Sequence, residues 1–323
     1  MSMAIRLHAT GGADMLRWEH VPKPEPGPGE LLLRQEAIGL NYIDIYFRTG
    51  LYKLPHLPAV IGQEGAGIVE AVGSDVTGFH PGDRVAYAGS LGAYATHRVI
   101  HASSAIKLPD SIDSRVAAAI TLQGLTAHYL LFRTYKVQRG DRILVHAAAG
   151  GVGLLLCQWA SHIGAEVIGV TSTEEKAELA RRHGAAHTII GHQTLAADVK
   201  RITGGEMVPV VYDSIGRVTF NASLDCLAPL GLMVSFGNSS GPVPPVELSL
   251  LSAKGSLFIT RPSLATYTAR PAVRDQMAAD LFKAIADGVL TPQINQTFPL
   301  EKAAEAHIAL EARQTTGQTV LIP

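Results

Sequence analysis

The middle of the chain alternates apolar runs with amphipathic segments. Six short runs are almost wholly apolar, and they cover residues 142–146, 166–171, 187–190, 208–213, 232–236 and 256–260. Such runs are typical of parallel strands that are buried on both faces of a sheet. The first segment between them has apolar residues at the spacing of one helix face, namely Val152, Leu155, Leu156, Trp159, Ala160 and Ile163. This alternation predicts an α/β fold with a doubly wound, six-stranded parallel sheet.

The segments on either side follow a different pattern. The first 120 residues contain strand-like runs at 30–34, 66–72 and 84–88, separated by turns rich in Gly and Pro. After residue 262 the sequence predicts helices over 275–287 and 300–313 and a last strand over 319–322. About sixty residues are few for an independent domain. We therefore expect a β-rich domain at 1–124, the doubly wound domain at 125–261, and a return segment at 262–323 that completes the first domain.

Composition narrows the class of protein. Of the 323 residues, 47% are hydrophobic and 17% are charged, which predicts a large packed core and not a disordered chain. The net charge is −1 and no basic cluster occurs, so we expect no nucleic-acid partner. The sequence shows neither a secretory signal pattern nor an apolar run long enough for a membrane span. With only two cysteines, the chain is expected in the reducing cytoplasm.

A glycine-containing segment lies where the first of the six strands meets the first helix. It reads His146-Ala147-Ala148-Ala149-Gly150-Gly151-Val152-Gly153, and against the dinucleotide fingerprint G-x-G-x-x-G it has Ala148, Gly150 and Gly153 at the three glycine positions. Gly150 lets backbone N–H groups approach a pyrophosphate, and Gly153 lets the helix pack close to the strand. The helix N-terminus adds donors and partial positive charge. We interpret the segment as a dinucleotide-binding turn; the alternative is a turn that only links strand to helix.

The second strand favours NADP over NAD. An NAD site usually carries an acidic residue at the end of this strand, which binds the ribose 2′-hydroxyl. Here the strand ends without an acid, and Ser172 and Lys176 offer a hydroxyl and an ammonium group to a 2′-phosphate. Glu174 and Glu175 lie between them, but in the first turn of a helix they can face away. The alternative for Lys176 is a solvated charge on that helix.

The cysteines and histidines do not form a zinc-binding pattern. A catalytic zinc site needs thiolate or imidazole ligands that the fold brings together. Cys157 and Cys226 both fall in the doubly wound domain. The histidines of the first domain are scattered without ligand spacing, at His8, His20, His56, His80, His97 and His101. We expect no catalytic zinc.

Six segments of the chain form a combination that is far more specific than any one of them. They are Gly39-Leu40-Asn41-Tyr42-Ile43-Asp44-Ile45-Tyr46, Gly62-Gln63-Glu64-Gly65-Ala66-Gly67, Pro81-Gly82-Asp83-Arg84-Val85, Ala148-Ala149-Gly150-Gly151-Val152-Gly153, Ser235-Phe236-Gly237-Asn238-Ser239-Ser240-Gly241 and Thr260-Arg261-Pro262. Together they resemble the zinc-independent quinone oxidoreductases, the zeta-crystallin-like branch of the medium-chain dehydrogenase/reductase superfamily, over essentially the whole chain. The zinc branch carries Cys in place of Asn41 and Gly-His-Glu in place of residues 62–64.

The resemblance implies an architecture and an assembly. It implies a GroES-like catalytic domain that holds both termini, a Rossmann domain in the middle, a substrate cleft between the two, and NADPH as cofactor. It also implies a homodimer in which two Rossmann sheets pair edge to edge. The last strand of the sheet, residues 256–260, has neither charge nor proline, which is expected of an edge that pairs with a second copy.

The resemblance further implies roles for individual residues. Asn41, Tyr46 and Tyr52 are expected to be catalytic and to line the pocket for nicotinamide and quinone. The residues implied in cofactor binding are Tyr42, Tyr129, Gly150, Gly151, Val152, Gly153, Ser172, Lys176, Ser214, Phe236, Gly237, Asn238, Arg261 and Arg313. Bacterial members tend to have a tyrosine near the adenosine phosphate where this chain has Gly191, and His192 is the neighbouring side chain able to replace it. This departure leaves the strength of the NADPH preference open.

The implied reaction is hydride transfer from the nicotinamide of NADPH to a quinone, which gives a hydroquinone without zinc. Negative charge builds on the quinone oxygen, and the Asn41 amide and the Tyr46 phenol are donors that can stabilise it. The alternatives for these residues are a turn-forming asparagine and a half-buried packing tyrosine. Two other functions stay open: NADPH-dependent reduction of the C=C bond of enones or enals, and a non-catalytic NADPH- or RNA-binding role.

Overall fold

The computed structural model describes residues 2–323, which divide into two compact units. The first unit holds the residues up to Leu125 together with Thr268–Ala286 and Pro292–Pro323. The second unit holds Thr126–Tyr267 and Asp287–Thr291. The C-terminal segment therefore lies mostly in the unit that contains the N-terminal strands.

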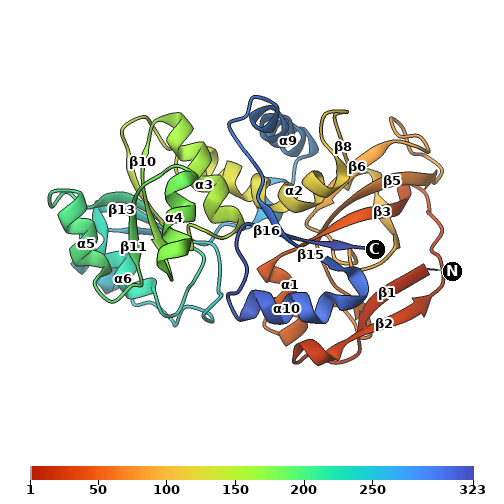
Figure 1. Ribbon diagram of the computed structural model, residues 1–323, viewed down its shortest axis with the longest axis horizontal. Coiled ribbons are helices and arrows are strands. Elements are labelled where there is room, and N and C mark those ends of the chain that lie inside the picture. Colours follow the sequence, from red (N-terminus) through yellow and green to blue (C-terminus); the bar gives the residue numbers. More distant parts are fainter. Residues whose placement is uncertain (1) are drawn as a thin grey trace. The chain divides into compact units, whose positions relative to one another are not determined.

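The second unit is built on a six-stranded parallel sheet with the order β11-β10-β9-β12-β13-β14. Figure 1 labels β10, β11 and β13 of this sheet. The strands are β9 (Arg142–His146), β10 (Glu166–Thr171), β11 (Ala185–Ile190), β12 (Val208–Asp213), β13 (Leu227–Ser235) and β14 (Phe258–Thr260). This is the doubly wound Rossmann order, and it confirms the predicted fold class. The order reverses between β9 and β12, so the carboxyl ends of these strands flank the place where such folds bind dinucleotides.

Helices join these strands and cover the sheet. They are α3 (Gly151–Ile163), α4 (Glu174–Arg182), α5 (Leu195–Ile202), α6 (Phe220–Asp225), α7 (Leu248–Ala253) and α8 (Leu264–Tyr267). Helix α3 packs on β9 and β10, and α4 packs on β10 and β11 beside it (Figure 1). The face that α3 buries includes Leu155, Leu156 and Trp159, the residues whose spacing predicted the helix. The helix ends at Gly164, which takes the left-handed conformation with φ 94°.

The first unit is β-rich and contains a seven-stranded and a three-stranded sheet. Its strands are β1 (Ser2–Leu7), β2 (Leu16–Val21), β3 (Glu30–Leu40), β4 (Ala59–Val60), β5 (Glu64–Val72), β6 (Arg84–Ala88), β7 (His97–His101), β8 (Ile106–Lys107), β15 (Ile294–Pro299) and β16 (Gln318–Ile322). Strand β3 pairs with β5, β7 and β16, so a C-terminal strand lies beside an N-terminal one (Figure 1). This pairing holds the end of β3 in place, and the candidate catalytic residues begin directly after it, at residue 41.

The helices of the first unit are α1 (Tyr42–Thr49), α9 (Pro271–Ala286) and α10 (Ala303–Glu311), and α2 (Ser114–Tyr129) passes from the first unit into the second. Helix α9 starts at Pro271, earlier than the sequence predicted, because proline is compatible with a first helical position. The segment expected as one helix over 300–313 is a 3-10 turn followed by the shorter α10. Strand β15 was not predicted, since its side chains are polar or half-buried and only its pairing with β16 defines it.

Strand β13 also begins earlier than predicted. Its pairing with β12 shifts between Val208 and Val210, and Leu230 takes a positive φ of 63° in the shifted stretch. Pro229 and Gly231 flank it, and these turn residues hid the first part of the strand from the sequence pattern. No helix within residues 2–323 has the length and apolar character needed to cross a membrane.

Candidate active site

Helix α1 carries the candidate catalytic residues of the first unit. Asn41 is its N-cap, with extended backbone, and Asp44 three residues later accepts a hydrogen bond from the Asn41 backbone N–H at 3.0 Å. An acidic residue at this position stabilises a helix start, because it satisfies an N–H group that has no partner within the helix. The local sequence therefore starts a helix at Asn41 and places Tyr42 and Tyr46 one turn apart.

The structure brings the tyrosines of this segment together. The ring centroids of Tyr42 and Tyr46 are 5.5 Å apart, and those of Tyr46 and Tyr52 are 5.2 Å apart with edge-to-face geometry. Gly50 ends α1 with φ 83°, and this reversal lets Tyr52 return to the helix, where its N–H donates to the Tyr46 carbonyl at 3.0 Å. Three of the sequence-predicted residues thus form one aromatic cluster.

The side-chain amide of Asn41 is buried and held by two neighbours. Its Nδ2 donates to Glu64 Oε2 at 2.6 Å, and its Oδ1 accepts from Gln123 Nε2 at 3.1 Å. Glu64 is the first residue of β5, and its Oε1 accepts from the Leu122 N–H in α2. Asn41 is therefore more than a turn residue, because its side chain links the start of α1 with a strand and a helix.

Two carboxyl groups lie buried around Asn41. Burial raises the pKa of Glu64 to about 8; its hydrogen bonds from Asn41 and Leu122 act against this shift. Burial also raises the pKa of Asp44 to about 7, against hydrogen bonds from the Asn41 backbone and the Tyr94 hydroxyl. Both values are far above those of exposed carboxyls, so each group can exist in its neutral form near neutral pH.

A buried polar chain continues from Asp44 toward α10. The Tyr94 hydroxyl lies 3.0 Å from Asp44 Oδ2 and 2.9 Å from His307 Nε2. Burial, with the nearby Arg48 guanidinium, lowers the pKa of His307 to about 3, so this imidazole is neutral. Arg48 is itself buried, and it donates to Glu311 Oε1 at 2.7 Å at the end of α10. These contacts anchor α1 to the C-terminal segment and so fix the helix that carries Tyr42 and Tyr46.

The glycine turn of the second unit has the geometry predicted for it. Helix α3 begins at Gly151, one short turn after β9, and Val152 lies in its first turn. Its N-cap is Gly150, which has no side chain to cover the N–H groups of the helix start. A Cβ on Gly153 would lie 2.2 Å from the Ala147 carbonyl oxygen and 2.8 Å from Ala148 Cα. Gly153 is therefore required for the close approach of helix and strand.

The first glycine position of the fingerprint is Ala148, and the neighbouring strand accommodates its methyl group. A Cβ on Gly169 of β10 would lie 2.8 Å from Ala148 Cβ, so the bare Cα of Gly169 leaves room for that methyl. The Ala148 N–H donates to the Val170 carbonyl at 3.0 Å, which keeps the turn against β10. The departure at Ala148 thus leaves the turn intact.

This exchange gives a testable prediction. Gly169→Ala should destabilise the protein by about 1–3 kcal/mol, because two methyl groups would compete for one space. Adding Ala148→Gly to that variant should restore most of the lost stability, because only one of the two positions then carries a methyl group. Urea unfolding of the wild type, both single variants and the double variant measures this coupling. Equal destabilisation of Gly169→Ala with and without Ala148→Gly would contradict the packing argument.

The residues predicted for a 2′-phosphate lie just beyond β10. Ser172 is exposed, and Lys176 lies in the first turn of α4, whose N-cap Thr173 accepts from the Lys176 N–H at 3.3 Å. The Glu174 carboxylate is paired with Arg181 at 2.5 Å, so this acidic side chain is drawn along α4 and its charge is compensated. The Glu175 carboxylate instead hydrogen-bonds to Thr173 and to its own backbone N–H, so it stays at the start of α4, and only Glu174 is directed away.

Gly191 lies at the same edge of the sheet, where its N–H donates to the Thr171 carbonyl at 2.9 Å. Its φ of 79° is a conformation that a tyrosine adopts only with strain. His192 follows directly and is half-buried. The backbone therefore favours glycine here, and the neighbouring imidazole is the side chain available at this corner.

Ser214, Phe236, Gly237, Asn238 and Arg261 follow the carboxyl ends of β12, β13 and β14. Buried Asp213 accepts from the N–H groups of Ile215 and Gly216 at 2.7 and 3.0 Å and so shapes the loop after β12. A Cβ on Gly237 would lie 2.3 Å from the Ser214 carbonyl oxygen, so the loops after β12 and β13 are in close backbone contact that only glycine allows. Arg261 Nη1 donates to the carbonyls of Ser235 and Gly237 at 2.9 and 3.0 Å. These predicted residues form one connected edge.

Tyr129 and Arg313 complete the set. The Tyr129 ring stacks on Tyr267 with centroids 4.4 Å apart, and burial raises its pKa. The chain then forms a π-helical turn at Leu130–Thr134, where the Leu130 carbonyl accepts from the Tyr212 hydroxyl at 3.0 Å. Arg313 belongs to the first unit and lies near the C-terminal end of the sequence. Burial raises the pKa of Tyr42, and the positive charge of Arg313 acts against this shift.

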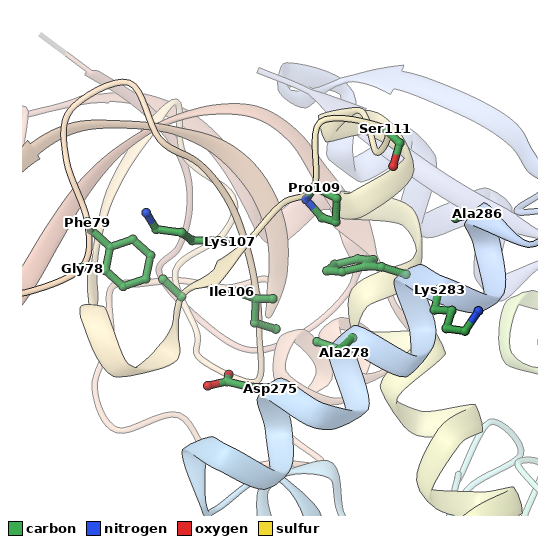
Figure 2. A pocket seen from close by; sticks show the side chains of 13 residues that line it. Gly78, Phe79, Ile106, Lys107, Pro109, Ser111, Asp275, Ala278, Lys283 and Ala286 are labelled. Atoms are coloured by element: carbon green, nitrogen blue, oxygen red, sulfur yellow. The ribbon is translucent and has the colours of Figure 1, made fainter.

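A groove of about 630 Å³ in the first unit contains none of the predicted residues (Figure 2). Phe79 and Lys107 lie on one side, and Asp275, Ala278 and Lys283 follow α9 on the other. Its polar groups are engaged elsewhere: Lys107 pairs with Asp83, and Asp275 with Arg274. No group of three His, Cys, Asp or Glu residues that could hold a metal ion occurs within residues 2–323.

Comparison with known proteins agrees with this arrangement. Residues 27–110 match the alcohol dehydrogenase GroES-like domain, and residues 151–273 match the zinc-binding dehydrogenase domain. A quinone oxidoreductase of Pseudomonas aeruginosa is 53% identical over the full length of both chains. The chain belongs to the quinone oxidoreductase family of the medium-chain dehydrogenases/reductases.

Two further family members bear on the chemistry. The crystal structure of Escherichia coli quinone oxidoreductase complexed with NADPH superimposes with a TM-score of 0.97, at 46% identity, covering 99% of this chain and 100% of that one. A 2-haloacrylate reductase of a Burkholderia species is 46% identical, covering 100% of this chain and 99% of its own. The family thus includes a structure with NADPH and a member named for an acrylate substrate.

The structure adds site residues that the sequence reasoning did not select. Glu64 and Gln123 hold the Asn41 amide, and Asp44 holds its backbone. Glu64 and Asp44 stood within two of the six quoted segments, which was a usable signal. Gln123 carried none, because it lies far from Asn41 in sequence and only the packing of α2 on β3 and β5 brings it there.

Proposed function

We propose that this chain reduces quinones to hydroquinones by hydride transfer from NADPH. The observation that carries the proposal is its full-length similarity to quinone oxidoreductases, one of them solved with NADPH. The geometry of each unit supports it: a Rossmann edge with a glycine turn in the second unit, and a cluster of amide and phenol donors in the first. No metal ligand set is required for this reaction.

The residues of the second unit fit a dinucleotide. Gly150 puts no side chain at the start of α3, Gly153 lets that helix lie close to β9, and the helix start supplies N–H donors and partial positive charge. Ser172 and Lys176 would hold the 2′-phosphate, and Ser214 and Arg261 lie toward the opposite end of the strand edge. When bound, NADPH supplies the hydride; the chain supplies position and charge stabilisation.

In the first unit, Asn41 and Tyr46 would act on the acceptor. Reduction of a quinone by hydride leaves negative charge on oxygen, and a positioned N–H or O–H donor stabilises that charge most where water is excluded. Asn41 uses one amide N–H on Glu64, which leaves a second N–H, and Tyr46 is almost fully buried beside it on α1. A proton from solvent then completes the hydroquinone, so neither side chain has to titrate.

The test is the rate of NADPH absorbance loss with 1,4-benzoquinone, with and without a strong chelator. Fast oxidation that the chelator does not slow is expected. The same assay with NADH measures cofactor preference. Tight NADPH binding without turnover of any quinone would overturn the assignment.

A second candidate function is reduction of an activated C=C bond, and the similarity to 2-haloacrylate reductase favours it. The same hydride geometry serves an enone, enal or acrylate, because charge again develops on an oxygen conjugated to the reacting carbon. Side-by-side turnover of 1,4-benzoquinone, an enone and 2-chloroacrylate distinguishes the two. The chain is assigned to whichever class gives the larger kcat/KM.

The NADPH preference leads to a prediction about α4. Lys176→Ala should weaken NADPH binding about tenfold and leave NADH binding unchanged, because one ion pair with the 2′-phosphate is lost. Lys200→Ala, which removes a lysine from α5, is the matched control. Fluorescence titration with both cofactors measures the effect. Equal losses for NADPH and NADH would show that Lys176 does not read the 2′-phosphate.

We also propose a cytoplasmic homodimer. The edge strand β14 has Phe258 at 59% exposure, so the end of the Rossmann sheet carries an exposed aromatic side chain. Leu248 on α7, the helix that precedes β14 in the chain, is 80% exposed. The two cysteines are free thiols, as is usual in a reducing compartment. Light scattering should give twice the chain mass for the wild type and a single chain mass for Phe258→Lys. A wild-type monomer would contradict the proposal.

A further inference from the structure

With Glu64 in its carboxylate form, the Asn41 amide can adopt only one of its two orientations without loss. Its Nδ2 faces the Glu64 carboxyl at 2.6 Å, and its Oδ1 faces the Gln123 NH₂ group at 3.1 Å. Turning the amide over would set oxygen against oxygen at Glu64 and NH₂ against NH₂ at Gln123. Leaving a buried donor or acceptor without a hydrogen-bond partner costs more free energy than a typical hydrogen bond contributes to stability. One N–H is therefore used on Glu64, and the direction of the other is fixed.

Three backbone elements keep Glu64 in this position. Its side chain starts at the first residue of β5 and is fully buried. On β3, a Cβ at Gly39 would lie 2.3 Å from Glu64 Oε2, so only glycine leaves room for the carboxyl. In α2, the Leu122 N–H donates to Oε1. The fold thus supplies N–H donors to both oxygens of one buried carboxyl, an arrangement that a carboxylate satisfies and an amide cannot.

We propose that Glu64 is a positioning residue for the reaction: together with Gln123 it orients the Asn41 amide so that its second N–H addresses the oxygen of the acceptor. The inference rests on the proposed function, because it requires an acceptor oxygen at Asn41. It gives a reason for a carboxyl group buried at this point whose hydrogen-bond donors, the Asn41 amide and the Leu122 N–H, are both uncharged. Glu64 acts through Asn41 and does not itself touch the acceptor.

Glu64→Gln is the direct test. It turns one oxygen into an NH₂ group, which must then face either Asn41 Nδ2 or the Leu122 N–H. We expect kcat with 1,4-benzoquinone to fall about tenfold or more, while the dissociation constant of NADPH changes by less than about twofold. Glu70→Gln is the matched control on the same strand, where Glu70 pairs with Lys23 at the surface. This control should keep the wild-type kcat.

A double-mutant cycle separates positioning from structure. In an Asn41→Ala background, Glu64→Gln should lower kcat by less than about a further twofold, because the amide that Glu64 orients is gone. A merely structural role would lower kcat by the same factor in both backgrounds. Gln123→Leu provides a second variant, should Glu64→Gln fail to fold. It removes the donor to Asn41 Oδ1 and should also lower kcat about tenfold.

Binding of 1,4-hydroquinone, measured by titration calorimetry, adds a readout that does not depend on turnover. We expect Glu64→Gln to weaken it about fivefold and Glu70→Gln to leave it unchanged. Wild-type kcat and hydroquinone affinity in Glu64→Gln, or equal losses in both backgrounds of the cycle, would overturn the inference and leave the proposed function standing. A wild-type protein without quinone or enone reduction would overturn the proposed function, and this inference with it.

Discussion

Replacing Asn41 with alanine is expected to lower the kcat of quinone reduction about a hundredfold. In the proposed reaction, the side chain offers the acceptor a buried N–H whose direction Glu64 and Gln123 set. A donor of this kind is worth most as charge develops on the oxygen, so the loss should appear mainly in kcat and less in the KM for quinone. Stopped-flow measurement of NADPH oxidation at saturating quinone gives this rate.

The effect should be separable from unfolding. Alanine loses the capping-box contact between the Asn41 side chain and the Asp44 backbone N–H, which should cost about 1 kcal/mol of stability. The Asp44 contact to the Asn41 backbone N–H is retained, so the helix start should persist. NADPH affinity should fall far less than kcat, since Asn41 is expected beside the nicotinamide alone and the predicted cofactor contacts of the second unit are untouched. Asn295→Ala, at an exposed asparagine of the same unit, is the control. An Asn41→Ala enzyme with wild-type kcat would exclude the amide from the reaction.

Gly153→Ala should reduce NADPH affinity about a hundredfold and destabilise the second unit by about 3 kcal/mol. The added methyl group would meet backbone atoms at 2.2 and 2.8 Å, and backbone has no rotamer by which to move away. Helix α3 would have to shift from β9, and with it the N–H groups at the helix start. Fluorescence titration of NADPH and urea unfolding measure the two effects.

Gly150→Ala is the informative comparison. A Cβ there would lie 3.2 Å from the Ala147 carbonyl oxygen, and the φ of −82° suits any residue, so the fold should tolerate it. In the proposed binding mode, its methyl group would nevertheless occupy the approach of the pyrophosphate. We expect Gly150→Ala to weaken NADPH binding while unfolding near the wild-type urea concentration. If Gly153→Ala bound NADPH normally, the packing role of that glycine would be wrong.

The sequence was informative wherever a local pattern has a local cause. Near-continuous apolar runs predicted the buried parallel strands, and the spacing of Leu155 and Trp159 predicted α3. Prediction was weakest where pairing partners are remote. Strand β15 is defined only by β16, and the irregular start of β13 is hidden by Pro229 and Gly231.

The same division holds for the candidate site. The sequence by itself determined the chemical groups: the glycine turn, the hydroxyl and ammonium after β10, and the amide and phenols of α1. Only the tertiary structure decided how those groups are held. It buried Glu64 against the bare Cα of Gly39 and brought Gln123 to Asn41. It also made room for Ala148 at Gly169. These relations join residues far apart in the chain, and no local pattern records them because they depend on which surfaces pack together.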